Sequence, residues 1–183
     1  MTLLHLETAD ALLLVVDLQA RLFPHIADGE RIEQQSIRMI RAARELALPV
    51  VISEQYRDGL GPTLPSVLAG ATDATIVEKL AFSVCGDPSA MNRLEALGRR
   101  QILLVGIEAH VCVQQTALDL LGRGLAPIIL ADAVSSRRAF DRDIAFERMR
   151  QAGVIVTTVE SAIFEMTRQA GTELFKRILP IVR

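Results

Sequence analysis

The sequence predicts an α/β protein of three layers, in which a mostly parallel sheet of six strands lies between two layers of helices. Along the 183 residues, short apolar runs of strand length alternate with longer amphipathic stretches, as is typical of βαβ units. The run ILLVG at 102–106 shows no polar alternation, which indicates a strand buried on both faces. No internal repeat or linker interrupts the pattern, so we expect a single domain over residues 1–183.

Six segments are expected to be strands because they are short and apolar, and several are rich in β-branched residues. In chain order they are Ala11–Val16, Pro49–Ser53, Thr75–Val77, Gln101–Val105, Pro127–Leu130 and Val154–Thr157. The first strand stops at Asp17, and the third stops at Glu78 and Lys79. A loop rich in glycine and proline, Arg57–Pro65, separates the second strand from the third.

Six longer segments have the pattern of helices. In chain order they are Glu30–Leu46, Pro88–Leu97, Val111–Leu121, Asp141–Gln151, Ser161–Gln169 and Thr172–Leu179. The first of them places Ile32, Ile37, Ile40 and Leu46 on one apolar face. Asp87 is expected to cap the second helix. The crossovers between parallel strands should be right-handed.

The composition argues against nucleic-acid and membrane partners. Twenty basic and 22 acidic residues leave a formal net charge of −2, and one Tyr without any Trp makes base-stacking platforms improbable. Ala11–Val16 is too short to span a bilayer, and no basic leader precedes it. We therefore expect a cytoplasmic protein in which Cys85 and Cys112 are reduced, and two cysteines are too few for a cysteine-rich zinc site.

Three reactive side chains follow strand ends, at the edge where such sheets bind ligands. They are Asp17, Lys79 and Cys112, the last in GIEAHVC before a helix. Taken singly, each has another explanation: Asp17 as the cap of a turn, Lys79 as a solvated strand end, and Cys112 as a small core residue. Together they indicate a cysteine nucleophile. Lys79 and the helix start favour the thiolate, while Asp17 accepts the thiol proton and returns it to the leaving group. Glu78 should point to the opposite side of its strand.

Five segments carry a family pattern: LLLVVDLQARLF, VVISEQY, EKLAFSVCG, LLVGIEAHVCVQQTALDLL and TTVESAIFEM. Through them nearly the whole chain resembles the isochorismatase-like cysteine hydrolases, and among these the isochorismatase-domain proteins of unassigned substrate. The resemblance implies a sheet order of 3-2-1-4-5-6 and a triad of Asp17, Lys79 and Cys112. It implies hydrolysis of a small amide or related acyl compound through a covalent thioester-type intermediate. It also implies an oxyanion hole of the backbone N–H groups of Glu108 and Cys112, with a cis peptide at Ile107–Glu108.

Two differences from the patterns of known family members argue against particular activities. Nicotinamidases carry an Asp-x-His motif after the second strand and a further His, whereas this chain has SEQY at 53–56 and no histidine between His25 and His110. We therefore predict no catalytic metal, and we predict no cofactor. The founding vinyl-ether hydrolases lack the nucleophilic cysteine, so Cys112 argues against isochorismatase activity itself.

Five further residues lie beside the expected site in sequence and are candidate substrate contacts: Gln19, Phe23, Tyr56, Phe82 and His110. Phe23 and Phe82 are equally well explained as core residues, and Gln19 as a partner of loop backbone. His110 is expected to face away from Cys112, which leaves Asp17 as the base. The loops around these residues predict a small, largely apolar pocket for a small-molecule substrate.

Two other functions stay open. An activated Cys112 is vulnerable to oxidation, so a thiol-based redox protein that uses Cys85 as partner is one alternative, although packing explains Cys85 better. A non-catalytic oligomeric interaction domain on the same fold is the other. The last helix carries Phe175, Ile178 and Leu179, which fit either an oligomer interface or the core. The resemblance itself implies a homo-oligomer.

Overall fold

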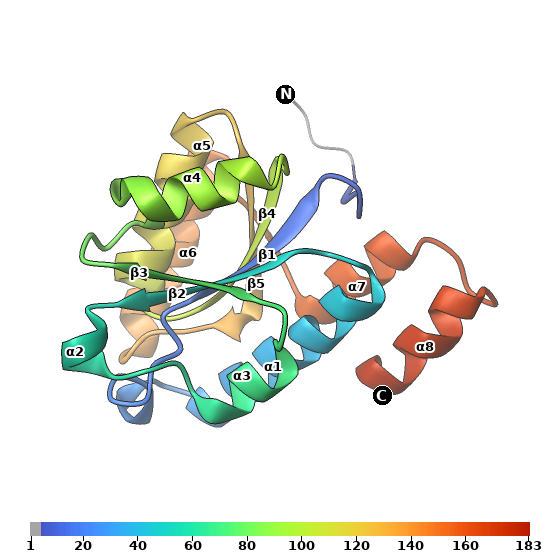
Figure 1. The fold of residues 1–183 in the computed structure, drawn as a ribbon, viewed down its shortest axis with the longest axis horizontal. Helices are drawn as coiled ribbons and strands as arrows, with labels where there is room; N and C mark the ends of the chain where they lie inside the picture. Colours follow the sequence, from blue (N-terminus) through green and yellow to red (C-terminus); the bar gives the residue numbers. More distant parts are fainter. Residues whose placement is uncertain (1–4) are drawn as a thin grey trace.

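The computed structural model describes residues 5–183 and contains a six-stranded sheet with helices on both faces (Figure 1). Neighbouring strands are parallel throughout, in the order β3-β2-β1-β4-β5-β6, so the predicted fold class and sheet order are confirmed. The strands are β1 (Ala11–Val16), β2 (Val50–Gln55), β3 (Thr75–Lys79), β4 (Gln101–Gly106), β5 (Ala126–Val134) and β6 (Ile155–Thr157).

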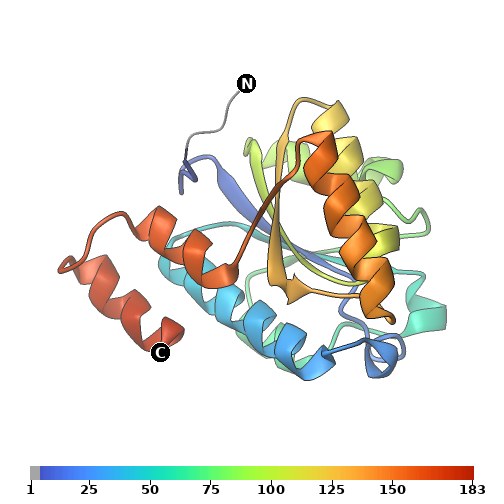
Figure 2. The same ribbon diagram turned by 180° about the vertical axis from the view of Figure 1, so that it is seen from behind.

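The helices form the two outer layers (Figures 1 and 2). One layer contains α1 (Gly29–Glu45), α3 (Pro65–Gly70), α7 (Val159–Thr167) and α8 (Glu173–Val182). The other layer contains α4 (Pro88–Ala96), α5 (Gln114–Gly122) and α6 (Ala139–Ala152). The remaining helical segments are α2 (Arg57–Leu60), the 3₁₀ turns η1 (Phe23–His25) and η2 (Val84–Gly86), and the π-helical turn η3 (Ala109–Val113).

Strand β1 lies at the centre of the sheet, and its side chains alternate between two hydrophobic cores. Leu13 and Val15 pack in the core on the α1 side, while Leu14 and Val16 pack in the core on the α4 and α5 side. All six residues of the strand are completely buried. Burial on both faces explains why this run contains no polar residue before Asp17.

The predicted elements exist in the predicted order, and the differences lie at their ends. The expected loop Arg57–Pro65 contains α2, and α3 begins at its final proline, because proline is well suited to the first turn of a helix. The expected helix over Val111–Leu121 is preceded by the π-helical turn η3, which contains Cys112. Asp87 caps α4 as predicted, since its carboxylate accepts a hydrogen bond from the Ala90 N–H at 3.0 Å.

The backbones of β1 and β4 approach closely at the carboxyl edge of the sheet. Gly106 pairs with Val16 and has a φ of +120°. A Cβ atom at Gly106 would lie 2.0 Å from the carbonyl oxygen of Val16, so no other residue fits there. The Ile107 N–H donates to the same oxygen at 2.9 Å. This contact brings the residue after β1, Asp17, close to the turn that carries Cys112.

Candidate active site

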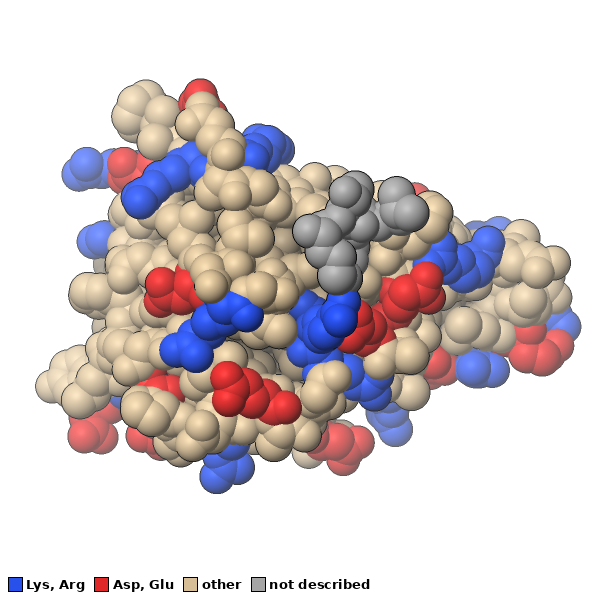
Figure 3. Space-filling view, turned by 90° about the horizontal axis from the view of Figure 1, so that it is seen from above, with Lys and Arg blue, Asp and Glu red and all other residues tan. Residues whose placement is uncertain are grey.

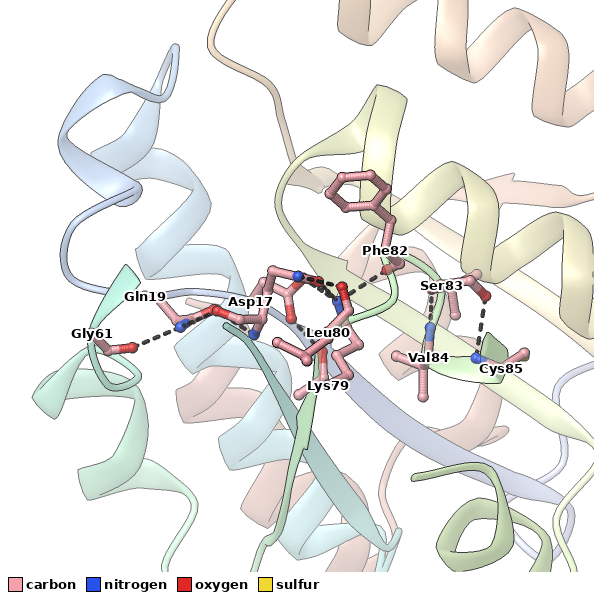
Figure 4. Close-up of polar contacts among 12 residues, drawn as sticks. Asp17, Gln19, Gly61, Lys79, Leu80, Phe82, Ser83, Val84 and Cys85 are labelled. Atoms are coloured by element: carbon pink, nitrogen blue, oxygen red, sulfur yellow. Dashed lines mark hydrogen bonds and ion pairs between the residues drawn. The ribbon is translucent and has the colours of Figure 1, made fainter. Parts of the chain in front are cut away.

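A buried ion pair occupies the carboxyl edge of the sheet (Figure 4). Lys79 Nζ lies 2.7 Å from Asp17 Oδ2, and both side chains are fully buried. The side chains of β3 alternate, so that Lys79 points inward while Glu78 is exposed, as the strand pattern predicts. The pair joins the ends of β1 and β3 across the intervening strand β2.

The ammonium group of Lys79 has an acceptor for each of its three N–H bonds. Besides Asp17, it donates to Gln55 Oε1 at 2.9 Å and to the carbonyl oxygen of Phe82 at 3.0 Å. A lysine held in this way is a fixed positive charge, because rotation or departure of the ammonium would break buried hydrogen bonds.

Asp17 has the environment of a base. Its Oδ1 accepts a hydrogen bond from Ser53 Oγ at 2.7 Å, and its backbone adopts the left-handed region with a φ of 51°. Burial raises the pKa of Asp17 above its ordinary value, against the opposing effects of the Lys79 charge and of the Ser53 hydrogen bond. A carboxylate with a raised pKa accepts a proton more readily, which suits general base catalysis.

The thiol of Cys112 meets this carboxylate from the neighbouring turn η3. It is 5% exposed and is hydrogen-bonded to the Asp17 side chain and to the backbone N–H of Glu108. Burial, followed by the negative charge of Asp17, raises the pKa of Cys112 to about 12 and outweighs Lys79. Lys79 thus favours the thiolate as predicted, but burial and the Asp17 charge outweigh it, so the thiol of the free protein is neutral at ordinary pH and lies against a proton acceptor.

The turn before Cys112 is held by the side chain of Glu108. Its buried carboxylate pairs with the Arg137 guanidinium and accepts the Arg137 backbone N–H at 3.1 Å. The peptide bond between Ile107 and Glu108 is cis. His110 Nδ1 lies 2.9 Å from Ser136 Oγ, and His110 lines a recess of about 310 Å³ with Arg137, Arg138 and Asp141. His110 Nδ1 also lies 3.4 Å from Glu108 Oε2, so His110 contacts both the turn before Cys112 and the β5–α6 connection.

Of the other predicted substrate contacts, Gln19 and Phe23 have structural partners. Gln19 is fully buried, accepts the Gln55 N–H at 2.7 Å and donates to the carbonyl oxygens of Gln55 and Gly61 at 3.0 and 2.6 Å. Both of its amide N–H bonds are thus used by backbone carbonyl groups, which leaves none for a substrate. Phe23 is half-buried, packs against the core on the α1 side and lies next to Gly29.

Tyr56 and Phe82 lie at the rim of the site instead. Each follows a strand end, and their side chains are 54% and 53% exposed. The Phe82 ring points away from the ion pair, whereas its carbonyl oxygen faces Lys79 (Figure 4). Leu80 between them in sequence is also exposed, so large apolar side chains follow the ends of β2 and β3 at the surface.

Sequence reasoning missed Ser53 and Gln55, which contact the ion pair directly. Both lie in β2, one on each side of Glu54, and face the same side of the sheet. The signal was available, because polar residues two positions apart at the end of an otherwise apolar strand have a reason to be buried.

Over residues 5–183, no three His, Cys, Asp or Glu side chains are grouped so that they could hold a metal ion. No helix in this part of the chain has the length and apolarity needed to cross a membrane.

The chain is thus an α/β protein in which a buried Asp–Lys pair lies beside a cysteine at the carboxyl edge of a parallel sheet. Residues 11–161 match the isochorismatase domain family. Isochorismatase family protein 1B of Dictyostelium discoideum is 41% identical over 93% of this chain and 85% of its own length. The chain therefore belongs to the isochorismatase-like hydrolase family.

Solved structures of similar proteins have the same fold as this chain. The structure described as MAR1 ribonuclease from Caenorhabditis elegans superposes with a TM-score of 0.92 at 40% identity, over 97% of this chain and 92% of that one. The YcaC gene product of Escherichia coli, described as an octameric hydrolase of unknown specificity, gives 0.90 at 23% identity over 98% and 93%. The second likeness shows the fold alone.

Proposed function

We propose that this protein is a metal-independent cysteine hydrolase that acts on a small amide or related acyl compound. The observation that supports this function best is the contact of the Cys112 thiol with a carboxylate that is itself paired to Lys79 at 2.7 Å. A nucleophile, a proton acceptor and a fixed charge thus meet in one buried place.

In the first half-reaction, Asp17 accepts the proton of the Cys112 thiol as Sγ attacks the substrate carbonyl carbon. The C=O double bond opens, and the oxygen takes the negative charge near the N–H groups of Glu108 and Cys112. The tetrahedral intermediate then collapses. The C–N bond breaks, Asp17 gives its proton to the leaving amine, and a thioester on Cys112 remains.

In the second half-reaction, a water molecule attacks the thioester carbonyl while Asp17 accepts one of its protons. The C–S bond breaks, the product leaves as a carboxylic acid or its anion, and the sulfur recovers the proton from Asp17. Lys79 donates no proton in either step, because its hydrogen bonds fix it as a charge that stabilises ionised Asp17 or Cys112.

The redox alternative is less favoured by the same geometry. Cys85 and Cys112 are both free and buried, and burial raises the pKa of both thiols. Peroxide reacts with the thiolate, so two protonated and buried thiols are a poor redox pair. A non-catalytic domain would have no use for an intact set of Asp17, Lys79 and Cys112.

RNA is the competing substrate class, because a 40% identical relative is described as a ribonuclease. Two features favour a small acyl compound. Basic and acidic side chains are interspersed on the face shown in Figure 3, and the formal net charge is −2, whereas RNA backbones require positive charge. The thiol is also 5% exposed, which suits a small substrate.

Trapping of the intermediate tests the proposal. The protein is incubated with a panel of small amides, and ammonia release, hydroxamate formation with hydroxylamine and the intact mass are followed. Turnover with an acyl adduct on Cys112, both lost in Cys112→Ala and kept in Cys85→Ala, is the expected result. Full turnover by Cys112→Ala, or cleavage of a fluorescent RNA that Cys112→Ala abolishes, would refute it.

We further propose that residues 1–183 form one domain, that the protein is cytoplasmic, and that it assembles as a homo-oligomer. The oligomer is supported by the octameric E. coli relative and by large apolar side chains on the surface. The exposed ones include Leu80, Phe82, Phe140 and Ile144. Light scattering at micromolar concentration distinguishes the oligomer from a monomer.

A further inference from the structure

Strand β2 lies between the two partners of the ion pair. In the sheet, β2 lies between β3 and β1. Lys79 is the last residue of β3 and Asp17 directly follows β1, so the Lys79 side chain must reach across the end of β2. Gln55 is the register partner of Lys79, and Ser53 is the partner of Val16, one residue before Asp17. Side chains of β2 on this face therefore fill the space between Lys79 and Asp17.

Ser53 contacts Asp17 twice. Its hydroxyl donates to Oδ1 at 2.7 Å, and its carbonyl oxygen accepts the Asp17 N–H at 3.1 Å. Because Lys79 occupies Oδ2, the carboxylate is held at both oxygens and cannot rotate freely. Ser53 is completely buried, so replacing its hydroxyl by a water molecule would cost free energy.

Gln55 holds the lysine in a corresponding way. Its Oε1 accepts from Lys79 Nζ at 2.9 Å, while its Nε2 donates to the carbonyl oxygen of Leu80 at 2.8 Å. The backbone of Gln55 is in turn bonded at both its N–H and its C=O to the buried amide of Gln19. The amide group is thus fixed in orientation, with its oxygen toward the ammonium.

We propose that Ser53 and Gln55 are positioning residues of this site: Ser53 orients the carboxylate that receives the thiol proton, and Gln55 anchors the Lys79 charge against it. The role assigned to each depends on the proposed function of Asp17 as the base. The contacts themselves are independent of any substrate, so a test without substrate separates the two proposals.

The pKa of Asp17 is the first readout, followed through its carboxyl carbon by ¹³C NMR and assigned with Asp17→Asn. In Ser53→Ala the pKa of Asp17 rises by about one pH unit, because the anion loses a buried hydrogen-bond donor. Ser53→Thr, which keeps the hydroxyl, returns it toward the wild-type value. Ser36→Ala is the matched control, since it removes a buried hydroxyl on α1 away from the site.

Gln55→Glu tests the second residue by the same signal. A second carboxylate shares the charge of Lys79 and adds a like charge, so the pKa of Asp17 rises again. Gln101→Glu is the matched control, because Gln101 is a buried glutamine at the start of β4, at the opposite edge of the sheet. If Gln55→Glu does not fold, Gln55→Met replaces it. The hydrogen exchange of the Lys79 ammonium, observed by ¹⁵N NMR, then accelerates about tenfold because one acceptor is lost.

An unchanged Asp17 pKa in folded Ser53→Ala would overturn the role of Ser53. An unchanged pKa in Gln55→Glu, or unchanged ammonium exchange in Gln55→Met, would overturn that of Gln55. Shifts in these variants without amide turnover by the wild type would support the positioning roles and count against the proposed hydrolase. If a substrate is found, the acid limb of its kcat/KM profile moves with the Asp17 pKa in each variant.

Discussion

The carboxylate of Asp17 and the ammonium of Lys79 form an ion pair of 2.7 Å without exposure to solvent. A buried pair is strongly destabilising to break, since the partner left behind remains a buried charge. Lys79→Met is therefore expected to lower the free energy of unfolding by about 3–5 kcal/mol. Urea unfolding of the wild type, Lys79→Met, Asp17→Asn and the double variant measures this. The double variant should lose less than the sum of the two single losses, and simple additivity would contradict the interaction.

Asp17→Asn separates the acidity of the thiol from catalysis. The negative charge of Asp17 helps to raise the pKa of Cys112 to about 12, so its removal beside Lys79 should lower that pKa. Hydrolysis should nevertheless be lost, because the amide cannot accept the thiol proton. Ultraviolet absorbance of the thiolate against pH, in a Cys85→Ala background, gives the pKa. A variant with a raised thiol pKa would contradict the electrostatic account of this site.

The raised pKa of Cys112 predicts a loss of stability at alkaline pH. The native thiol binds its proton more tightly than the unfolded chain, so its contribution is complete below the ordinary value of 9.0 and is lost as the pH approaches about 12. By about pH 10.5 the free energy of unfolding should have fallen by about 2 kcal/mol relative to its value below pH 9.0. The measurement is the difference in unfolding free energy between wild type and Cys112→Ser at several pH values. A constant difference across that range would contradict the prediction.

Gly106→Ala should be among the most destabilising single changes in the chain. A Cβ atom 2.0 Å from the Val16 carbonyl oxygen forces β1 and β4 apart next to the site, at a cost of more than about 4 kcal/mol. Gly122→Ala in α5 is the control, because its Cβ would meet no atom within 4 Å. Thermal unfolding compares the two variants. Equal melting temperatures would show that the strands adjust without cost.

The parallel sheet and the placement of Asp17, Lys79 and Cys112 at its carboxyl edge could be predicted from local pattern, whereas the strand order was implied by the family resemblance. An unbroken apolar run marks a central strand, and a parallel sheet gathers its strand ends at one edge. The local pattern of β2 indicates that Ser53 and Gln55 are buried, but which side chains they contact depends on the register of β2 against both neighbouring strands, which a local pattern does not contain. The state of the Cys112 thiol also required the structure, since burial and the charge of Asp17 had to be weighed against Lys79.

The enclosure of Lys79 has a practical consequence for chemical labelling. Lys79 and Lys176 are the two lysines of the sequence, and the side chain of Lys176 is 64% exposed on α8. An amine-reactive ester should therefore modify the native protein at Lys176 while sparing Lys79. Incorporation of label at Lys79 then reports opening of the sheet edge around Asp17, so a peptide map after brief acylation serves as a footprint of the intact site.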